Sequence, residues 1–455
     1  VFTAPAASYA DGTTVWPRGF AGPRIPQHDG PFPRPTNLLD GRARIRVVAL
    51  EPLTTVPLDL VGLRVTGAAV DGRRARWRHR GGKLDVIPTA ALAAGDEVVV
   101  EVRYRGNPGL TGSPWGPVGW EVLHDGAVVA AQPSGACTWF PCNDLAAQKA
   151  PFTVTITTPS AYLGLANGTL RSTRSSGSTT TRVYEQTEPT SPYLMTVHVG
   201  RYVQRDIPRD DRRDDERDDR LDAGDTLVPI TAVHDPADGP AFDRAFAHQG
   251  EMIDLFEDLF GPYPFAAGYT VVVCPEDLEI PLEAQGQSIF GRNHLHGHHE
   301  RLIAHELAHQ WFGNSLTAAT WRDIWLHEGF ACYAEWLWSE HAGGPSAHDL
   351  ARQHHDRLRN LPHDLVLADP GRVDLFDDRV YKRGALTLHA LRLRLGDDAF
   401  FDLLRRWTAA GRHGLVSTEG FEAMAESVGG SGLQALFDAW LRATAVPALP
   451  PVTGA

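Results

Sequence analysis

The chain has 455 residues, of which 42% are hydrophobic and 22% charged, and its formal net charge is −13 at pH 7. A chain of this length exceeds the size at which a single hydrophobic core stops growing, so two or three domains are expected. The acidic balance argues against nucleic acid and against an anionic membrane surface as partners, since both select basic faces. No run of eighteen apolar residues occurs, so no membrane span is expected.

The cysteines number four, which is too few for a disulfide scaffold, and none forms a Cys-x-x-Cys pair. Buried free thiols are the main expectation, with a bridge between Cys137 and Cys142 as the alternative.

Residues 8–10 resemble the end of a signal peptide, but a trimmed sequence explains a start at Val1 equally well. Secreted and cytoplasmic locations therefore both stay open.

The first half of the chain predicts β structure. Residues 1–43 are rich in Pro and Gly and lack periodicity, which is typical of an extended arm. Residues 44–205 carry short β-branched runs separated by turns, which predicts an antiparallel β domain. The strands expected there include 44–50, 56–60, 97–104, 152–158 and 194–199. Asp-Gly at 71–72 and 125–126 and Asn-Gly at 167–168 are typical of hairpin turns.

The second half predicts helices. Residues 206–226 mix both charges with very few apolar residues, which indicates an exposed linker. From 227 to 445 the hydrophobic period becomes 3.6, and 446–455 form a tail. Helices are expected at 242–260, 298–315, 322–341, 376–395, 397–408, 417–427 and 432–442, and a short buried strand at 269–273. The fold class is therefore α+β and multidomain, with an N-terminal antiparallel β domain before a mostly helical one.

Residues 305–309 read HELAH in a segment with a helical pattern. A spacing of four places His305 and His309 on one face of a helix, one turn apart, where both can reach one zinc ion. Glu306 lies a quarter turn away, so its carboxylate can reach a water on the metal rather than the metal itself. This motif alone arises by chance in a chain of this kind roughly once in twenty-five.

A catalytic zinc keeps three protein ligands and one open position, so a third ligand is required. Glu328 supplies it, in the sequence WLHEGF on the next expected helix, with eighteen residues between it and His309. Requiring a Glu at this distance lowers the chance of an accidental match to roughly one in six hundred. The sequence therefore predicts one Zn²⁺ per chain, held by His305, His309 and Glu328.

Four other segments accompany the metal motif. They are 132–150, with Gln-Pro and Trp-Phe-Pro-Cys-Asn-Asp; 260–265, Phe-Gly-Pro-Tyr-Pro-Phe; 280–284, Ile-Pro-Leu-Glu-Ala; and 381–385, Tyr-Lys-Arg-Gly-Ala. Together with the two metal segments they make residues 44–445 resemble the gluzincin aminopeptidases, the family of aminopeptidase N and leukotriene hydrolase. The resemblance implies a thermolysin-like catalytic domain.

The resemblance also implies an activity and its residues. It implies a zinc aminopeptidase that removes N-terminal residues from peptides by attack of a zinc-bound water, with Glu306 as the general base. Tyr381 would hydrogen-bond the developing oxyanion. Glu283 and Gln132 match the positions that bind the free α-amine of a peptide substrate. Without the resemblance, Tyr381 would be interpreted as a packed aromatic side chain and Glu283 as a loop carboxylate.

The chain departs from the family pattern in three ways. Segment 280–284 keeps its Glu but lacks the family's Gly, Met and Asn, and Pro281 removes a backbone N–H. Gln132 is neutral where many relatives carry Glu. The chain ends shortly after its last expected helix, so a short two-domain form with a more open cleft is expected.

Other functions stay open. An endopeptidase or an epoxide hydrolase on the same scaffold is the enzymatic alternative, because Gln132 and the altered segment 280–284 weaken the exopeptidase pattern. A catalytically dead binding module would have lost a zinc ligand or the base, and none is lost. The histidines of the loop 294–299 could hold a second metal, although a solvated rim loop is the simpler interpretation. Asp323 could orient a metal ligand or be a helix-surface charge.

Overall fold

The computed structural model describes residues 37–209, 227–296, 299–430 and 432–451, so most of the predicted arm and linker and the end of the tail lie outside the described residues. The contacts divide the chain into two compact units, Val1–Ala150 and Pro151–Ala455. The first strand begins at Leu39, within the segment predicted as an arm. The domain limits at 44, 206, 227 and 446 remain predictions.

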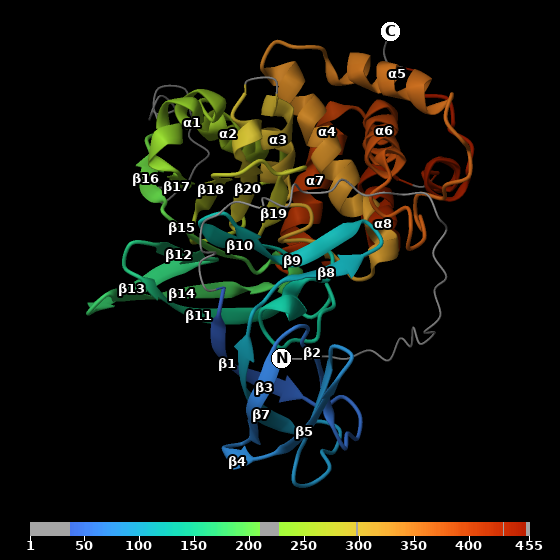
Figure 1. The fold of residues 1–455 in the computed structure, drawn as a ribbon. Helices are drawn as coiled ribbons and strands as arrows, with labels where there is room; N and C mark the ends of the chain where they lie inside the picture. The colour runs from blue at the N-terminus through green and yellow to red at the C-terminus, as the bar shows by residue number, and fades with distance from the viewer. Residues whose placement is uncertain (1–36, 210–226, 297–298, 431, 452–455) are drawn as a thin grey trace. The chain divides into compact units, whose positions relative to one another are not determined.

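The first unit is built of antiparallel strands (Figure 1). Its strands are β1 (Leu39–Val48), β2 (Val56–Asp59), β3 (Arg64–Val70), β4 (Arg73–Arg74), β5 (Arg76–Arg80), β6 (Lys83–Ile87), β7 (Glu97–Gly106), β8 (Leu110–Ser113), β9 (Gly116–Leu123) and β10 (Gly126–Ala130). Two of its sheets have the orders β1-β7-β3-β4 and β2-β6-β5. Alternate residues of β7, Val98, Val100, Val102 and Tyr104, point into the core, which is the period-2 pattern of a half-buried strand. The Asp-Gly pairs at 71–72 and 125–126 join paired strands, as predicted.

The second unit begins with further antiparallel strands, β11 (Ala150–Pro159), β12 (Leu163–Ala166), β13 (Thr169–Ser176), β14 (Thr179–Thr190) and β15 (Val197–Gly200). The hairpin predicted at Asn167-Gly168 is wrong, because β12 pairs with β15 and β13 pairs with β14. The buried Asn167 amide instead donates to the carbonyls of Leu194 and Gln285, 2.9 Å from each. Asn167 belongs to a residue type that is common in turns, but here its side chain joins two other segments by buried hydrogen bonds.

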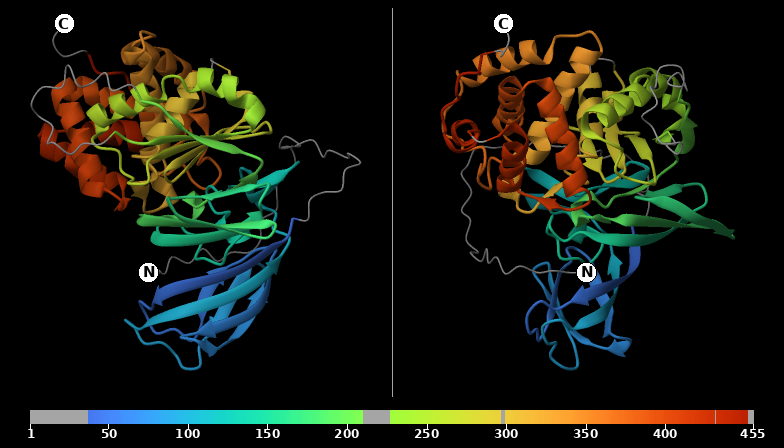
Figure 2. Two further views of the ribbon diagram at one scale, coloured as in Figure 1. Left: turned by 90° about the vertical axis from the view of Figure 1, so that its left-hand side faces the viewer. Right: turned by 180° about the vertical axis from the view of Figure 1, so that it is seen from behind.

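A five-stranded sheet follows, with the order β16-β17-β18-β20-β19. Its strands are β16 (Val203–Ile207), β17 (Ile230–His234), β18 (Tyr269–Cys274), β19 (Leu282–Ala284) and β20 (Gln287–Gly291), and the two pairs that β18 makes are parallel. Residues 271–274 of β18 are fully buried, as a central strand requires. Figures 1 and 2 show α1, α2 and α3 beside this sheet and the helices α4 to α8 grouped next to it.

The helices are α1 (Gly239–Ala245), α2 (Gln249–Phe260), α3 (Glu300–Ala308), α4 (Trp325–His341), α5 (Ala347–Leu358), α6 (Asp378–Leu395), α7 (Asp397–Gly411), α8 (Thr418–Gly429) and α9 (Gln434–Phe437), with a π-helical turn at Asp438–Arg442. The fold class is confirmed. None of the helices in the described ranges combines the length and the apolar character that a membrane crossing requires.

Two expected helices need correction, and one observed helix was not predicted. The expected helix 242–260 is two helices, since the chain turns between α1 and α2. The expected helix 298–315 ends at Ala308, and the turns that follow bring the side chains of Gln310 and Asn314 back to β19. Helix α5 was not expected, because its buried face consists largely of Ala and His rather than of large apolar side chains.

Helices α4 and α6 meet at two glycines. A Cβ atom added to Gly384 would lie 2.6 Å from the Cα of Gly329, and one added to Gly329 would lie 2.7 Å from the Cα of Gly384. Contacts this short cannot be relieved by a side-chain rotation, because both partners are backbone atoms. The two backbones therefore touch only because both residues are glycine.

Gly384→Ala should separate α4 from α6 and lower the free energy of unfolding by about 1–3 kcal/mol, the usual cost of overpacking a core. Chemical denaturation followed by circular dichroism would measure it. Gly112→Ala is the matched control, because no atom lies within 4 Å of its added Cβ and it should leave stability nearly unchanged. Equal stabilities of the two variants would contradict the close packing of the helices.

Candidate metal centre

Two imidazoles lie side by side at the end of α3. His305 is in its last turn and His309 is the residue after its end. Their ring centroids are 4.8 Å apart, and the exposed fractions of the two residues are 6% and 1%. The spacing of four along the helix thus produces the shared face that was predicted.

Glu328, in the first turn of α4, faces both imidazoles. Its Oε2 atom lies 3.4 Å from the Nε2 atom of His305 and 3.4 Å from the Nε2 atom of His309. Ligand bonds of about 2.0–2.2 Å in a tetrahedral site place ligand atoms about 3.3–3.5 Å apart. Both measured distances fall in this range, so one tetrahedral ion fits between the three side chains.

The other nitrogen of each ring is already engaged. His305 Nδ1 lies 2.8 Å from Oε1 of Glu335, and His309 Nδ1 lies 2.9 Å from the carbonyl oxygen of Phe312. An ionised carboxylate and a carbonyl only accept hydrogen bonds, so both Nδ1 atoms donate. In a neutral imidazole this leaves the Nε2 lone pair directed at Glu328, the orientation that zinc-binding histidines adopt.

Without a cation these groups repel one another, because the lone pairs of two imidazole nitrogens face a carboxylate in a buried site. Burial by itself lowers the pKa of both histidines, but the surrounding carboxylates outweigh it and raise the pKa of His305 to about 9 and that of His309 to about 10. The site therefore attracts positive charge, and a divalent ion can supply it while leaving both rings neutral. The residues present fit a zinc ion.

Glu306 lies beside this cluster without belonging to it. It is 4% exposed, and its Oε2 atom has no hydrogen-bond partner among the described residues. Ligand atoms of Glu306, Glu283 and His309 lie within 4.8 Å of one another. Burial and then the neighbouring carboxylates raise the pKa of Glu306 against the effect of the two histidines. A carboxylate held in this way is suited to accept a proton.

Tyr381 and Glu283 approach the same centre from different elements. Tyr381, in the first turn of α6, stacks on the His305 ring with 5.9 Å between centroids. Glu283 is the central residue of β19 and is 6% exposed. Burial is the largest cause that raises its pKa to about 8, and Glu328 and Glu306 add to it. The structure thus brings together all the predicted site residues of the second unit.

Gln132 belongs to the first unit, where it is half-buried two residues after β10. Its role in binding the amine of a substrate remains a prediction.

Some residues that support the candidate metal centre were not recognised in the sequence. The fully buried side chain of Gln310 donates to the carbonyls of Ala284 and Gln287 and accepts from the backbone N–H of Gly286. Asn314 donates to the same Ala284 carbonyl, at 3.0 Å. These amides attach the strand of Glu283 to the segment that carries the histidines. The sequence signal for this contact was the presence of amide side chains shortly after the HELAH motif, at Gln310 and Asn314.

Glu335 was also missed. It lies seven residues after Glu328, so both project from the same face of α4. Its Oε2 atom accepts from Arg301 at 3.1 Å, and the Lys382 ammonium lies 3.9 Å away. These cations and His305 more than offset burial and lower the pKa of Glu335 to about 2. It is therefore ionised at neutral pH and can hold His305 in place.

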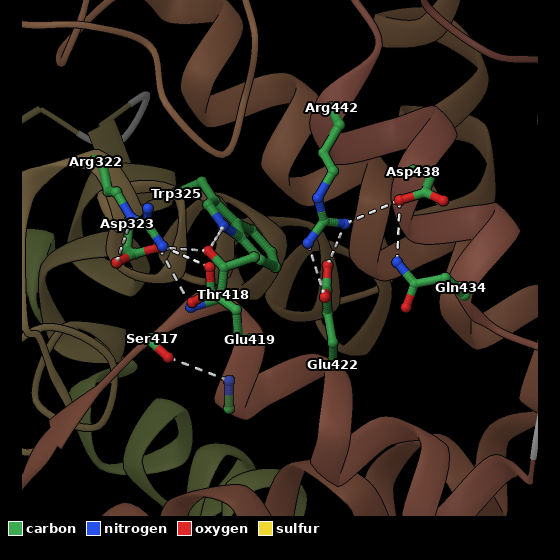
Figure 3. Close-up of polar contacts among 11 residues, drawn as sticks. Arg322, Asp323, Trp325, Ser417, Thr418, Glu419, Glu422, Gln434, Asp438 and Arg442 are labelled. Carbon is green, nitrogen blue, oxygen red and sulfur yellow. Dashed lines mark hydrogen bonds and ion pairs between the residues drawn. The ribbon is translucent and has the colours of Figure 1, made fainter.

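Asp323 has neither of the two roles weighed for it. It is buried, and its Oδ1 atom accepts from the hydroxyl of Thr418 at 2.6 Å and from the Thr418 N–H at 3.3 Å (Figure 3). The indole of Trp325 donates to the same hydroxyl, at 2.9 Å. Asp323 thus fixes the start of α8 against α4.

The histidine loop shows no second metal cluster among the described residues. His294 accepts from the Gly291 N–H at 3.0 Å and packs edge-on against His299. His298, which was included in the hypothesis, lies outside the described residues.

Comparison with protein families identifies both halves of the chain. The model of the peptidase M1 N-terminal domain matches residues 35–194, and that of the peptidase family M1 domain matches residues 244–440. The crystal structure of an M1 zinc metallopeptidase from Deinococcus radiodurans is 30% identical, with a TM-score of 0.82 over 92% of each chain. This chain belongs to the peptidase M1 family. The family predicted from the sequence is confirmed.

Curated relatives of this M1 peptidase are longer. Aminopeptidase M1 of Arabidopsis thaliana is 25% identical over 355 residues, which are 70% of this chain but 37% of the relative. Aminopeptidase N of Mus musculus is 26% identical over 60% of this chain and 30% of its own length. The chain thus spans between 30% and 37% of the length of these two proteins. A mutant of the Deinococcus radiodurans enzyme has also been crystallised bound to a Tyr-Ser-Ala substrate.

Glu335→Ala should weaken the affinity for zinc about 10- to 100-fold, as removal of a group that orients a metal-bound histidine does. Competition with a chelator, followed by metal analysis, measures it. Glu335→Gln should recover part of the affinity, because its amide oxygen can still accept from His305. Glu426→Ala removes a carboxylate of α8 and serves as the control. Unchanged zinc retention in Glu335→Ala would contradict the role given to this contact.

Proposed function

We propose that this M1 peptidase is a zinc aminopeptidase, which holds one Zn²⁺ per chain through His305, His309 and Glu328 and removes the N-terminal residue from peptides. The observation that carries the proposal is the position of the Glu328 carboxylate, 3.4 Å from the Nε2 atoms of both histidines whose Nδ1 atoms are engaged elsewhere. Homology to aminopeptidases supports it.

Zinc in this position would supply Lewis acidity to the scissile carbonyl and would lower the pKa of water. Glu306 has a buried carboxylate oxygen without a protein partner among the described residues, so it can take the proton of the attacking water. It can then deliver this proton to the leaving nitrogen. Glu306 is therefore the general base in this proposal.

Tyr381 can supply a donor to the oxygen that gains charge during the reaction. Burial is the largest cause that raises its pKa well above the usual value, and the carboxylates of the site add to it. The hydroxyl therefore keeps its proton at any pH at which the enzyme works. A neutral donor that meets charge only in the transition state lowers the barrier without tightening substrate binding.

Glu283 supports exopeptidase rather than endopeptidase specificity. Its carboxylate lies within 4.8 Å of ligand atoms of Glu306 and His309, beside the reaction centre, where the α-ammonium of a bound peptide would lie. We propose that Glu283 pairs with this ammonium and that Gln132 contributes a second contact, as the resemblance implies. An endopeptidase or an epoxide hydrolase would not need a free amine.

The comparison of free with N-acetylated peptides tests this proposal. The enzyme should release the first residue of free peptides and leave acetylated ones intact, because acetylation removes the charge that Glu283 pairs with. Equal cleavage of both would support the endopeptidase alternative. Absence of all hydrolysis by the zinc-loaded protein would favour a binding module.

Glu306→Gln should retain one zinc per chain and lose kcat by about 10²- to 10⁴-fold, because it removes the base without removing a ligand. Metal analysis and steady-state kinetics on an aminoacyl arylamide would measure both. Glu300→Gln on the same helix is the control, since that carboxylate contacts the exposed His248. Loss of zinc together with activity in Glu306→Gln would instead make Glu306 part of the metal site.

Tyr381→Phe should lower kcat about 10²- to 10³-fold and change KM little, the signature of a contact made only in the transition state. The Phe ring can keep the stacking on His305, so zinc content and thermal stability should be unchanged. A variant with more than half of the wild-type kcat would remove Tyr381 from the mechanism.

A further inference from the structure

Tyr193 lies in a short 3-10 turn, Pro192–Leu194, that is bonded to the strand of Glu283. The carbonyl of Leu194 accepts from the backbone N–H of Gln285 at 3.2 Å. The Asn167 amide joins the same two residues, since it donates to the Leu194 carbonyl and to the Gln285 carbonyl, at 2.9 Å each. The position of Tyr193 is thus fixed relative to β19.

The Tyr193 ring is packed against a second aromatic side chain. Its centroid lies 5.2 Å from that of Trp321, in an edge-to-face arrangement, and Trp321 in turn packs against His327, the residue before Glu328. Only 3% of Tyr193 is exposed. The ring therefore bridges the strand of Glu283 and the start of the helix that carries Glu328.

The hydroxyl of Tyr193 has no hydrogen-bond partner in the part of the chain that the structure describes. A buried hydroxyl without a partner destabilises a folded protein, so natural cores rarely keep one. Two other buried tyrosines do have partners: Tyr184 donates to the Gly164 carbonyl at 3.0 Å, and Tyr269 donates to Ser288 at 2.7 Å. An unpaired hydroxyl next to a candidate active site indicates a partner that arrives with a ligand.

The charges around the hydroxyl decide what kind of ligand this is. After burial, the negative charges of Glu283 and Glu328 are the causes that raise the pKa of Tyr193. These carboxylates attract the phenolic proton and leave the oxygen lone pairs free to accept. Glu283 is not one of the proposed zinc ligands, so its carboxylate attracts a cationic donor also when zinc is bound. A substrate ammonium fits, and its three N–H groups need more acceptors than Glu283 alone provides.

We propose that Tyr193 is a substrate-binding residue, whose hydroxyl oxygen accepts a hydrogen bond from the α-ammonium of the substrate next to Glu283. This inference rests on the proposed aminopeptidase function. It adds a neutral acceptor to the amine subsite from an element far from the metal motif in the sequence.

Two zinc-binding inhibitors that differ only in the amine test the proposal. L-leucine hydroxamate carries the α-ammonium, and 4-methylpentanohydroxamic acid has the same carbon chain without it. Calorimetric titration of the zinc-loaded protein, at a pH at which the amine is protonated, gives both dissociation constants. Tyr193→Phe should weaken binding of leucine hydroxamate about 10- to 100-fold, as loss of a hydrogen bond to a charged group does, and should leave the amine-free compound unaffected.

Tyr184→Phe is the matched control. It removes a hydroxyl that has a backbone partner, so it should lower the melting temperature and leave both dissociation constants unchanged. Tyr193→Phe should leave the melting temperature of the free enzyme unchanged or raise it, because its hydroxyl has no described protein partner. Lowered stability with intact affinity would show a structural role for Tyr193 and overturn the proposal.

The wild-type protein separates this proposal from the proposed function. If it binds both hydroxamates equally, it does not recognise the amine, and the aminopeptidase assignment fails together with this inference. If it prefers leucine hydroxamate and Tyr193→Phe keeps the same preference, the amine subsite exists without Tyr193. In that case only the present inference is overturned.

Discussion

The approach of one carboxylate to two imidazole nitrogens organises the catalytic half of this protein. Glu328 faces His305 and His309 in a site that water hardly reaches, and neither histidine can turn away because its other nitrogen is bonded. Three electron-rich groups in a buried space are stable together only around a cation. Contacts elsewhere in the fold must therefore hold α3, the residue after it and α4 close together against this repulsion.

Several contacts hold that arrangement. The close contact of Gly329 with Gly384 sets the distance between α4 and α6 and so the distance between Glu328 and Tyr381. The Gln310 side chain connects the segment after α3 to β19, which positions Glu283. Elements that are distant in the sequence are thus connected to the proposed metal ligands by buried hydrogen bonds and by backbone contact. Sites supported in this way keep the geometry that catalysis needs.

The sequence predicted what depends on local spacing. The shared face of His305 and His309 follows from helical geometry, and Glu328 was proposed as a third ligand because a catalytic zinc requires one. Contacts between distant segments could not be predicted in the same way. Asn167 was expected in a hairpin turn, yet its amide connects two other loops. Helix α5 was missed because Ala and His gave too weak an apolar pattern, and Gln310 gave no periodic signal at all.

X-ray absorption spectroscopy at the zinc edge of the purified protein tests the central claim most directly. Two imidazoles, one carboxylate and one open position predict a first shell of about four nitrogen and oxygen atoms at about 2.0–2.1 Å, with the outer-shell scattering of two imidazole rings. A sulfur scatterer at about 2.3 Å would place the metal on a cysteine instead. That result, or an octahedral shell of oxygen atoms, would contradict the account of this site.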